Sequence, residues 1–358
     1  MKNTYIIAEA GVNHNGSLDM AIELVNTAAT AGADAVKFQT FKSEHLVSKN
    51  AEKAEYQKVT TGSEESQLEM LKKLELDYEA HRLLINHCNS KKIQFLSTPF
   101  DKYSADFLIR ELDVPVIKIS SGDLTNAPLL LQIAQTGKPV ILSTGMSKLG
   151  EIETALSVLA FGYTHTKQPV SLSEFDDAFF SDEGQHLLRN KVTILHCTTE
   201  YPTPFEAVNL RAMDTLRDSF HLRVGLSDHT QGISVAIAAV ARGASVIEKH
   251  FTLDKNLPGP DHKASLDPVE LNQMVTSIRE VECALGNVTK VPTIAERKNK
   301  EVAQKSLVAA CEIKEGEIFT KDNLTVKRPS GGISPLQFWS WLGKTADRTY
   351  QVDEMIRE

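Results

Sequence analysis

Short apolar runs rich in β-branched residues recur along the first 252 residues, and segments of helical character separate them. Eight such runs occupy residues 4–11, 34–40, 92–100, 114–121, 139–145, 192–199, 222–228 and 245–252. Near-continuous apolar strands that alternate with helices are typical of a parallel sheet covered on both faces. Eight βα units within roughly 285 residues predict a (β/α)8 barrel. The alternative is an open doubly wound sheet, but the sequence has no Gly-rich dinucleotide-binding turn.

Four segments depart from this rhythm. Residues 48–75 are rich in Glu and Lys and are expected to be helical and on the surface, and the acidic residues 163–190 are expected to form a loop that decorates the connection between the fifth and sixth strands. Residues 286–304 are polar without an apolar period, which predicts a linker. Residues 305–358 contain short strands and turns, which predicts a small β-rich domain near the lower size limit for independent folding. The expected organisation is a catalytic barrel over 1–285, the linker, and this C-terminal domain.

Most of the apolar runs carry or end in a charged, amide or hydroxyl-bearing side chain. In a (β/α)8 barrel the C-terminal ends of the strands form one rim, and active sites lie there. We therefore expect a site at this rim, built from Glu9, Lys37, Gln39, Ser97, Thr98, Lys118, Ser121, Ser143, Thr144, His196, Thr198, Ser227, Asp228, Glu248 and His250. The alternative is that some of these residues only satisfy each other, because barrel interiors also hold layers of polar side chains.

Two apolar runs lead into a histidine: His229 follows Val224–Leu226, and His250 follows Ser245–Ile247. Two neighbouring strands would place both imidazoles at one rim, within reach of one metal ion. Asp261 follows in a Pro/Gly turn, which can aim its carboxylate inward. Two histidines this far apart are not a ligand-spacing signature, so two hydrogen-bonded histidines and a surface turn stay open as the alternative.

Composition narrows the class of protein. Hydrophobic residues make up 41% and charged residues 24% of the 358 residues, as in soluble globular proteins. The net charge of −8 argues against a nucleic-acid partner and requires local Lys or Arg for an anionic substrate. The sequence contains no apolar run near the ~20 residues of a membrane span, and we expect no signal peptide because the first residues lead directly into a strand-like run. Its cysteines (Cys88, Cys197, Cys283 and Cys311) form no CxxC pair, which indicates free thiols in a reducing cytoplasm.

A set of motifs along nearly the whole chain resembles the bacterial sialic acid synthase (N-acetylneuraminate synthase) family, which includes the legionaminic acid synthases. The motifs are AEAGVNHNGS, AVKFQTF, FLSTPFD, IKISSGD, ILSTGM, LHCTTEYPTP, GLSDHT, EKHFT, GPDH and VKRPSGGISP. The resemblance implies a TIM barrel followed by an antifreeze-like (SAF) domain, and an enzyme that condenses phosphoenolpyruvate with an acylated mannose-type sugar. The TEYPTPF stretch and the ISP ending resemble the neuraminate and legionaminate branches more than the pseudaminate branch.

The resemblance also implies roles for individual residues. His229 and His250 would be the protein ligands of a divalent metal, usually Mn²⁺, although Mg²⁺ or Co²⁺ also suits mixed nitrogen and oxygen ligands. Glu9 would face C2 of phosphoenolpyruvate, and Asp123, where many relatives have Glu, would hold a metal-bound water. The positions that match phosphoenolpyruvate contacts are Lys37, Thr98, Lys118, Ser121, Ser143, Ser227 and His229, with Thr199 where the family commonly has Asn. The positions that match sugar contacts are Gln39, Tyr201 and Asp261.

Arg328, in VKRPSGG of the SAF-like part, matches an arginine that reaches the acyl group of the sugar in the barrel of a partner subunit. The resemblance therefore implies a domain-swapped homodimer. Without it, an exposed arginine beside a proline is the simpler interpretation.

The expected reaction joins phosphoenolpyruvate, N-acetylmannosamine or a related acylated sugar, and water to give N-acetylneuraminate or a related nonulosonate and phosphate. A legionaminic acid synthase that acts on 2,4-diacetamido-2,4,6-trideoxymannose is one alternative. A metal-dependent barrel hydrolase or aldolase is another, because Lys118, flanked by Ile117 and Ile119, could form a Schiff base. A non-catalytic carbohydrate- or ice-binding protein is the third, and the charged, hydroxyl-rich rim argues against it.

Overall fold

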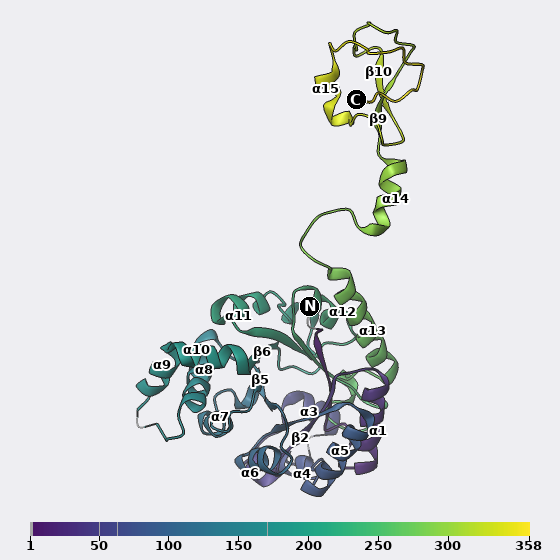
Figure 1. Cartoon of the computed structure of the whole chain (residues 1–358). Coiled ribbons are helices and arrows are strands. Elements are labelled where there is room, and N and C mark those ends of the chain that lie inside the picture. The colour runs from purple at the N-terminus through teal and green to yellow at the C-terminus, as the bar shows by residue number, and fades with distance from the viewer. Residues whose placement is uncertain (1–2, 50, 63, 170) are drawn as a thin grey trace. The chain divides into compact units, whose positions relative to one another are not determined.

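Eight parallel strands form the centre of the N-terminal part of the chain (Figure 1). The computed structural model describes residues 3–49, 51–62, 64–169 and 171–358. The chain divides into two units, Met1–Gly286 and Asn287–Glu358. The strands belong to the first unit, and a two-stranded sheet belongs to the second.

The strands close into the predicted barrel. They are β1 (Tyr5–Gly11), β2 (Ala35–Thr40), β3 (Gln94–Pro99), β4 (Ile117–Ile119), β5 (Val140–Ser143), β6 (Val192–Cys197), β7 (Arg223–Asp228) and β8 (Val246–His250). Parallel ladders join them in the order β3-β2-β1-β8-β7-β6-β5-β4, and β3 and β4, at the two ends of this order, also contact each other. The fold is therefore the (β/α)8 TIM barrel that the apolar runs predict.

Helices surround the strands in Figure 1. They are α1 (Leu18–Thr30), α2 (Ser43–Leu46), α5 (Tyr78–Lys91), α6 (Lys102–Asp106), α7 (Ala127–Ala134), α8 (Leu149–Thr164), α11 (Ala212–Phe220), α12 (Ser234–Ala241) and α13 (Pro268–Leu285), with the shorter or irregular turns η1 (Phe107–Glu111), η2 (Ser121–Asp123), η3 (Phe205–Ala207) and η4 (His262–Ala264). Side-chain caps begin several of them: Ser17, Asp77 and Asp267 each accept a hydrogen bond from a backbone N–H of the first turn. The apolar helix faces and the outward-facing strand residues form the main core.

Most of the described residues of the acidic segment 163–190 are helical, so the expectation of a loop is wrong. It contains the end of α8, all of α9 (Ser173–Phe180) and most of α10 (Asp182–Lys191). Ser181 caps α10 by accepting from the N–H of Gly184, and two acidic residues follow in the first turn. Carboxylates at that end of a helix are favourable because the helix dipole is positive there. The acidic composition therefore stabilises a helix start in this segment.

The segment 48–75 contains two helices, α3 (Glu55–Thr61) and α4 (Gln67–Lys72), which confirms its helical character. The expectation that it lies on the surface is wrong for part of it. Lys53, Met70 and Leu74 are buried, and the latter two pack in an apolar cluster with Val12 and Phe41. The composition of a segment rich in Glu and Lys does not reveal these three buried positions, because the solvent-facing residues dominate it.

The second unit is a small β-rich domain with its own core. Its antiparallel strands β9 (Ser306–Ala309) and β10 (Leu324–Lys327) are accompanied by η5 (Pro335–Gln337) and α15 (Phe338–Trp341). The core is made by Leu307, Ile313, Phe319, Leu324, Tyr350 and Ile356 with their neighbours. The stretch expected to be a linker includes a helix, α14 (Ile294–Ala303), which Thr293 and Glu296 cap reciprocally. No helix in the described ranges is long and apolar enough to cross a membrane.

Candidate active site

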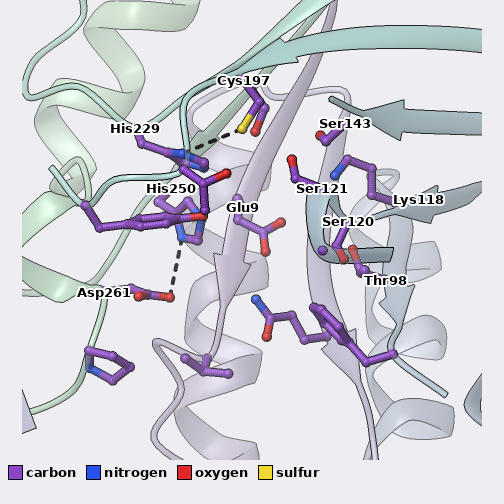
Figure 2. Close-up of a pocket in the computed structure, with 18 of the residues that line it drawn as sticks. Glu9, Thr98, Lys118, Ser120, Ser121, Ser143, Cys197, His229, His250 and Asp261 are labelled. Carbon is purple, nitrogen blue, oxygen red and sulfur yellow. Dashed lines mark hydrogen bonds and ion pairs between the residues drawn. The ribbon is translucent and has the colours of Figure 1, made fainter. Parts of the chain in front are cut away.

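A cavity of about 390 Å³ lies at the C-terminal ends of the barrel strands. This volume is typical of a small-molecule site. Side chains from every strand of the barrel line it: Glu9, Lys37, Gln39, Thr98, Lys118, Ser143, Cys197, Ser227, Glu248 and His250. The convergence expected at the rim is therefore present in the structure (Figure 2).

Strand alternation explains how these side chains reach the cavity. An apolar cluster inside the barrel contains one residue from each of six strands: Ile7, Ala35, Leu96, Ile141, Leu195 and Val246. Side chains two positions apart on a strand point to the same face. The residues two positions further along are Glu9, Lys37, Thr98, Ser143, Cys197 and Glu248. The apolar side chains thus form one layer inside the barrel, and the polar side chains form the next layer toward the C-terminal ends of the strands. This polar layer lines the cavity.

The polar layer contains a buried network of two lysines and two glutamates. Lys37 forms an ion pair with Glu9, and its Nζ lies 3.6 Å from Glu248 Oε2. Lys118 Nζ lies 3.3 Å from Glu248 Oε1, which also accepts a 2.7 Å hydrogen bond from the hydroxyl of Ser227. Glu248 is therefore the centre of the network, held between both ammonium groups.

The two glutamates differ in their affinity for a proton. Burial raises the pKa of Glu9 to about 7, against the opposing effect of Lys37. Burial also acts to raise the pKa of Glu248, but Lys118 and Lys37 outweigh it and lower this pKa to about 2. Neighbouring carboxylates in one buried site do not ionise equally easily. The network therefore holds one permanently ionised carboxylate, Glu248, and one that can exchange a proton near neutral pH, Glu9.

The two predicted histidines lie together on one side of the cavity, with ring centroids 5.5 Å apart. His229 Nδ1 lies 2.7 Å from the carbonyl oxygen of Thr198, which requires a proton on Nδ1 and turns Nε2 toward other partners. His250 Nδ1 lies 3.9 Å from Asp261 Oδ2, and a dashed line marks this contact in Figure 2. The ring of Tyr201 packs 4.0 Å from that of His229. Burial lowers the pKa of His250 well below its ordinary value and raises that of Asp261 to about 6.

The residues present fit a divalent ion held by two histidines. The buried Nδ1 of His250 makes no hydrogen bond within the described residues, so a lone pair is open to a ligand. A neutral imidazole is the form that binds metal, and burial favours that form for His250. No cluster of three or more His, Cys, Asp or Glu side chains in the described chain has ligand geometry. An ion here would therefore take its remaining ligands from substrate or water, which is the open arrangement of catalytic rather than structural sites.

The structure separates the predicted site residues into three groups. Those that line the cavity are Glu9, Lys37, Gln39, Thr98, Lys118, Ser121, Ser143, Thr199, Tyr201, Ser227, His229, His250 and Asp261. Asp123 does not line it: its carboxylate accepts from Ser120 Oγ at 2.7 Å and from Asn126 Nδ2 at 3.1 Å, and so stabilises its own turn. Arg328 is exposed in the second unit.

Other polar strand residues point away from the cavity and satisfy each other. The hydroxyls of Ser97 and Thr40 share a 2.7 Å hydrogen bond, and Thr40 Oγ1 also lies 2.9 Å from His81 Nε2. His196 donates to the carbonyl oxygen of Val208. These side chains face away from the barrel interior, because adjacent residues of a strand face opposite sides, so they form neither part of the site nor the interior polar layer that was its alternative.

Sequence reasoning assigned no individual role to Glu248 and did not place Cys197 in the site, although both line the cavity. Glu248 stood among the polar strand residues without a role, yet it is the centre of the charge network. Cys197 Sγ lies 3.8 Å from His229 Nδ1 and faces the cavity. The period-two count from the apolar layer, Val246 to Glu248 and Leu195 to Cys197, is the sequence signal that identifies both.

Comparison with known proteins agrees with this geometry. The NeuB family model matches residues 24–290, and the SAF domain model matches residues 304–358. The N,N'-diacetyllegionaminic acid synthase of Campylobacter jejuni is 52% identical over 358 residues, which cover 100% of both chains. That of Legionella pneumophila is 46% identical over 339 residues, or 95% of this chain and 89% of that protein.

The same likeness extends to solved structures. The crystal structure of the N-acetylneuraminic acid (sialic acid) synthetase of Leptospira borgpetersenii in complex with citrate superposes with a TM-score of 0.68 at 33% identity, covering 83% of this chain and 90% of that one. The matched barrel carries the cavity, and the matched C-terminal unit carries Arg328. With a family model that spans most of its length and relatives similar over all of it, the chain belongs to the NeuB family and carries a SAF domain.

Proposed function

We propose that this protein is a phosphoenolpyruvate-dependent nonulosonate synthase. It joins C3 of phosphoenolpyruvate to the aldehyde carbon of an N-acylated mannose-type sugar, and water adds at C2 so that phosphate leaves. The observation that carries the proposal is the pair of buried lysines, Lys37 and Lys118, that share a cavity with Glu9, Glu248 and two imidazoles in a chain of the NeuB family. The relatives named above synthesise diacetyllegionaminic acid and N-acetylneuraminic acid.

The lysine side of the cavity suits the anionic substrate. Two ammonium groups supply point charges for a phosphate and a carboxylate, and Thr98, Ser121, Ser143 and Ser227 add hydroxyl donors nearby. The buried hydroxyls of Ser143 and Thr199 have no hydrogen-bond partner within the described residues. A buried hydroxyl without a partner is costly, so these two groups favour a ligand that bonds to them.

Glu9 suits the role at C2. Positive charge develops on this carbon when C3 attacks the aldehyde, and an ionised carboxylate nearby stabilises that charge and accepts a proton from the attacking water. A pKa of about 7 places Glu9 at the value where it can both accept and return a proton at neutral pH. Glu248, which stays ionised, keeps both lysines charged and in place.

His229 and His250 would hold the divalent ion, for which we propose Mn²⁺, with Mg²⁺ or Co²⁺ as substitutes. Such an ion supplies Lewis-acid polarisation of the aldehyde oxygen, an effect of several kcal/mol. The Thr198 carbonyl orients His229, and Asp261 lies beside His250. Both carboxylate oxygens of Asp123 accept hydrogen bonds from its own turn, so we assign it no role with a metal-bound water.

For the sugar we propose 2,4-diacetamido-2,4,6-trideoxymannose ahead of N-acetylmannosamine. The sequence alone put N-acetylmannosamine first, and the two diacetyllegionaminic acid synthases at 52% and 46% identity reverse the order. The test is phosphate release from phosphoenolpyruvate with each sugar in the presence of Mn²⁺. Higher kcat/KM with the diacetamido sugar supports this order, higher kcat/KM with N-acetylmannosamine reverses it, and absence of release with both refutes the proposed reaction.

We also propose that the protein acts as a homodimer in which Arg328 of one subunit contacts the acyl group of the sugar in the barrel of the other. Arg328 is exposed and no hydrogen bond within the described residues uses its guanidinium, so it is available to a ligand. A guanidinium donates to a carbonyl oxygen in a fixed geometry, which suits an acyl group.

A further inference from the structure

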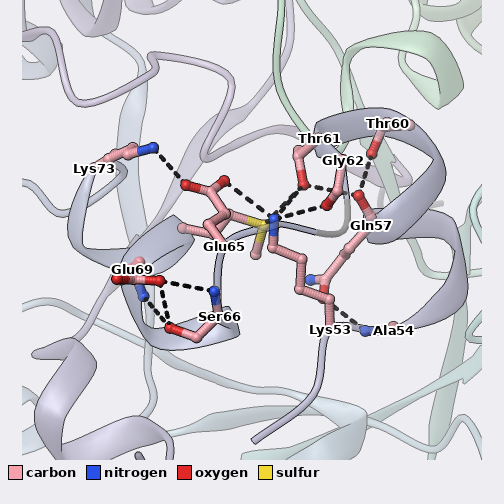
Figure 3. A network of polar contacts seen from close by, with 11 residues as sticks. Lys53, Ala54, Gln57, Thr60, Thr61, Gly62, Glu65, Ser66, Glu69 and Lys73 are labelled. Carbon is pink, nitrogen blue, oxygen red and sulfur yellow. Dashed lines mark hydrogen bonds and ion pairs between the residues drawn. The ribbon is translucent and has the colours of Figure 1, made fainter.

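A buried ammonium group that the proposed reaction does not use lies in the segment between β2 and β3. Lys53 is only 5% exposed. Its Nζ donates to three acceptors: Thr61 Oγ1 at 3.0 Å, the carbonyl oxygen of Gly62 at 3.0 Å and Glu65 Oε1 at 3.1 Å (Figure 3). An ammonium group has three donors, so all of them are used within this segment.

The acceptors belong to two different helices. Thr61 is the last residue of α3 and Gly62 is its C-cap, whereas Glu65 directly precedes Ser66, the N-cap of α4. Lys53 therefore ties the end of α3 to the start of α4, and Figure 3 shows it between the two helices. The other carboxylate oxygen of Glu65 pairs with Lys73, just beyond α4. Burying a charged group is costly unless it is paired and hydrogen-bonded, and here it fixes the relative position of two short helices.

These helices form one side of the cavity. Gln57 of α3, Gln67, Met70 and Leu71 of α4, and Leu74 line it, and we call this set the α3–α4 wall. Within the described residues the wall contributes amide and apolar groups and no charged side chain, while both lining lysines come from β2 and β4. An anion is attracted to the lysines. A neutral molecule with methyl groups fits the wall, because apolar contacts there are favourable and an unpaired charge is not.

We propose that the α3–α4 wall is the specificity surface for the neutral sugar, and that Lys53 is the positioning residue that holds this wall at the barrel mouth. The inference rests on the proposed function, since it assigns the second substrate of that reaction to the wall. The wall contacts the substituents of the sugar that lie away from the reacting aldehyde carbon. Met70 and Leu71 supply the apolar surface for methyl groups, and Gln67 supplies an amide for an acyl oxygen or nitrogen.

The experiment compares Lys53→Met with Lys72→Met. Lys72 is the matched control, because it ends α4 and pairs with Glu44 but its side chain is 49% exposed and joins no two helices of the wall. We expect Lys53→Met to raise the KM for the sugar about tenfold or more and to leave the KM for phosphoenolpyruvate within about twofold. Lys72→Met should change both values by less than about twofold, as is usual for an exposed ion pair. Met70→Ala, which alters the wall itself, should reduce the preference between the two sugars.

Two further measurements keep the test decisive. Thermal unfolding shows whether Lys53→Met is folded, and if it is not, Thr61→Val decides, because it removes a single acceptor of Lys53 at nearly constant volume. An unchanged sugar KM, or an equal rise in both KM values, overturns the inference and leaves the proposed function standing. A wild-type protein that releases no phosphate with either sugar overturns the proposed function instead.

Discussion

Two buried charge clusters each include residues of β7 and β8, and they differ in the properties that bear on function. One is the cavity network around Glu248, which faces into the barrel. The other joins the next residue, Lys249, to Asp228 at 2.8 Å and to the Thr230 carbonyl at 2.5 Å. Glu248 and Lys249 are consecutive, so strand alternation sends them to opposite faces.

The second cluster is closed and the first is open. Asp228 Oδ1 accepts from both the N–H and the hydroxyl of Thr230, and its other oxygen accepts from Lys249, so its hydrogen-bonding capacity is used internally. Beside the cavity network, Ser143 Oγ, Thr199 Oγ1 and His250 Nδ1 have no hydrogen-bond partner within the described residues. Burial and charge therefore do not identify a binding site by themselves. In this protein the site also contains buried donors and acceptors that have no hydrogen-bond partner within the described residues.

The largest effect is expected at the open cluster, for His250→Ala. Loss of this proposed metal ligand should reduce kcat/KM by about a thousandfold or more, since the proposed ion would supply several kcal/mol. The measurement is phosphate release with added Mn²⁺, and the melting temperature of the variant should stay near that of the wild type. A variant that keeps its full rate after treatment with a chelator would show that the reaction needs neither the histidine nor the ion.

Glu9→Gln should lower kcat far more than it raises the KM for phosphoenolpyruvate, by roughly 10²- to 10⁴-fold. The amide keeps the size of the side chain but removes its charge and, with it, the proposed proton acceptor at C2. Steady-state kinetics in both substrates measure the split. A variant with a raised KM and a normal kcat would show that Glu9 binds substrate and takes no part in the chemical step. Glu9 and Glu248 would then not differ in the way proposed.

The pH profile tests the same residue. Burial raises the pKa of Glu9 to about 7, so its carboxylate is protonated increasingly as the pH falls below that value. If the ionised form is required, kcat should decline on the acidic side of about pH 7. The wild-type profile is compared with that of Glu9→Gln, in which this limb should be missing from the residual rate. An identical acidic limb in both proteins would assign it to another group.

Arg328→Ala should lower kcat/KM roughly thirtyfold to several-thousandfold, because truncation of a charged donor that an interface buries, as the proposed dimer would bury Arg328, costs about 2–5 kcal/mol. Mixing this protein with His250→Ala and allowing subunits to exchange tests whether the arginine acts across subunits. Recovery toward a quarter of wild-type activity is expected for random pairing, since half of the dimers then contain one intact site. A mixture that stays inactive would place the arginine in its own subunit's site.

The smallest effect on activity is expected at the closed cluster, where the loss is one of stability. Lys249→Met leaves the buried Asp228 carboxylate without its cation, which should reduce the free energy of unfolding by about 3–5 kcal/mol. The matched change in the open cluster is Lys118→Met, which leaves Glu248 paired with Lys37 and Ser227. It should raise the KM for phosphoenolpyruvate with a much smaller loss of stability. Denaturant titration measures the loss of stability in both variants, and steady-state kinetics measure the KM for phosphoenolpyruvate. Equal losses of stability in Lys249→Met and Lys118→Met would contradict the proposed difference between the two clusters.

The recurrence of apolar runs along the sequence predicts the barrel, whereas it does not predict the structure of the segments inserted between them. The eight apolar runs coincide with β1–β8 because a strand buried on both faces must be apolar along its length, whatever surrounds it. The composition of segment 163–190 predicts a loop, but α9 and α10 form there. Acidic residues favour a helix only in its first turn, so their effect depends on where each helix begins. The burial of Met70 was not predicted because it depends on packing against the distant Val12. The burial of Lys53 was not predicted because it depends on how α3 and α4 are placed around its ammonium group.

The sequence by itself determined that eight strands alternate with helices and that polar groups follow them, because both features are written in the order of residues along one chain. It also indicated His229, His250 and Glu9 through motifs that resemble a family. Only the tertiary structure decided which polar residues share the cavity, because adjacent positions of one strand can both be polar and differ in the face to which they point. For the same reason Glu248 and Lys249, one position apart, became the centre of the site and part of the scaffold, respectively.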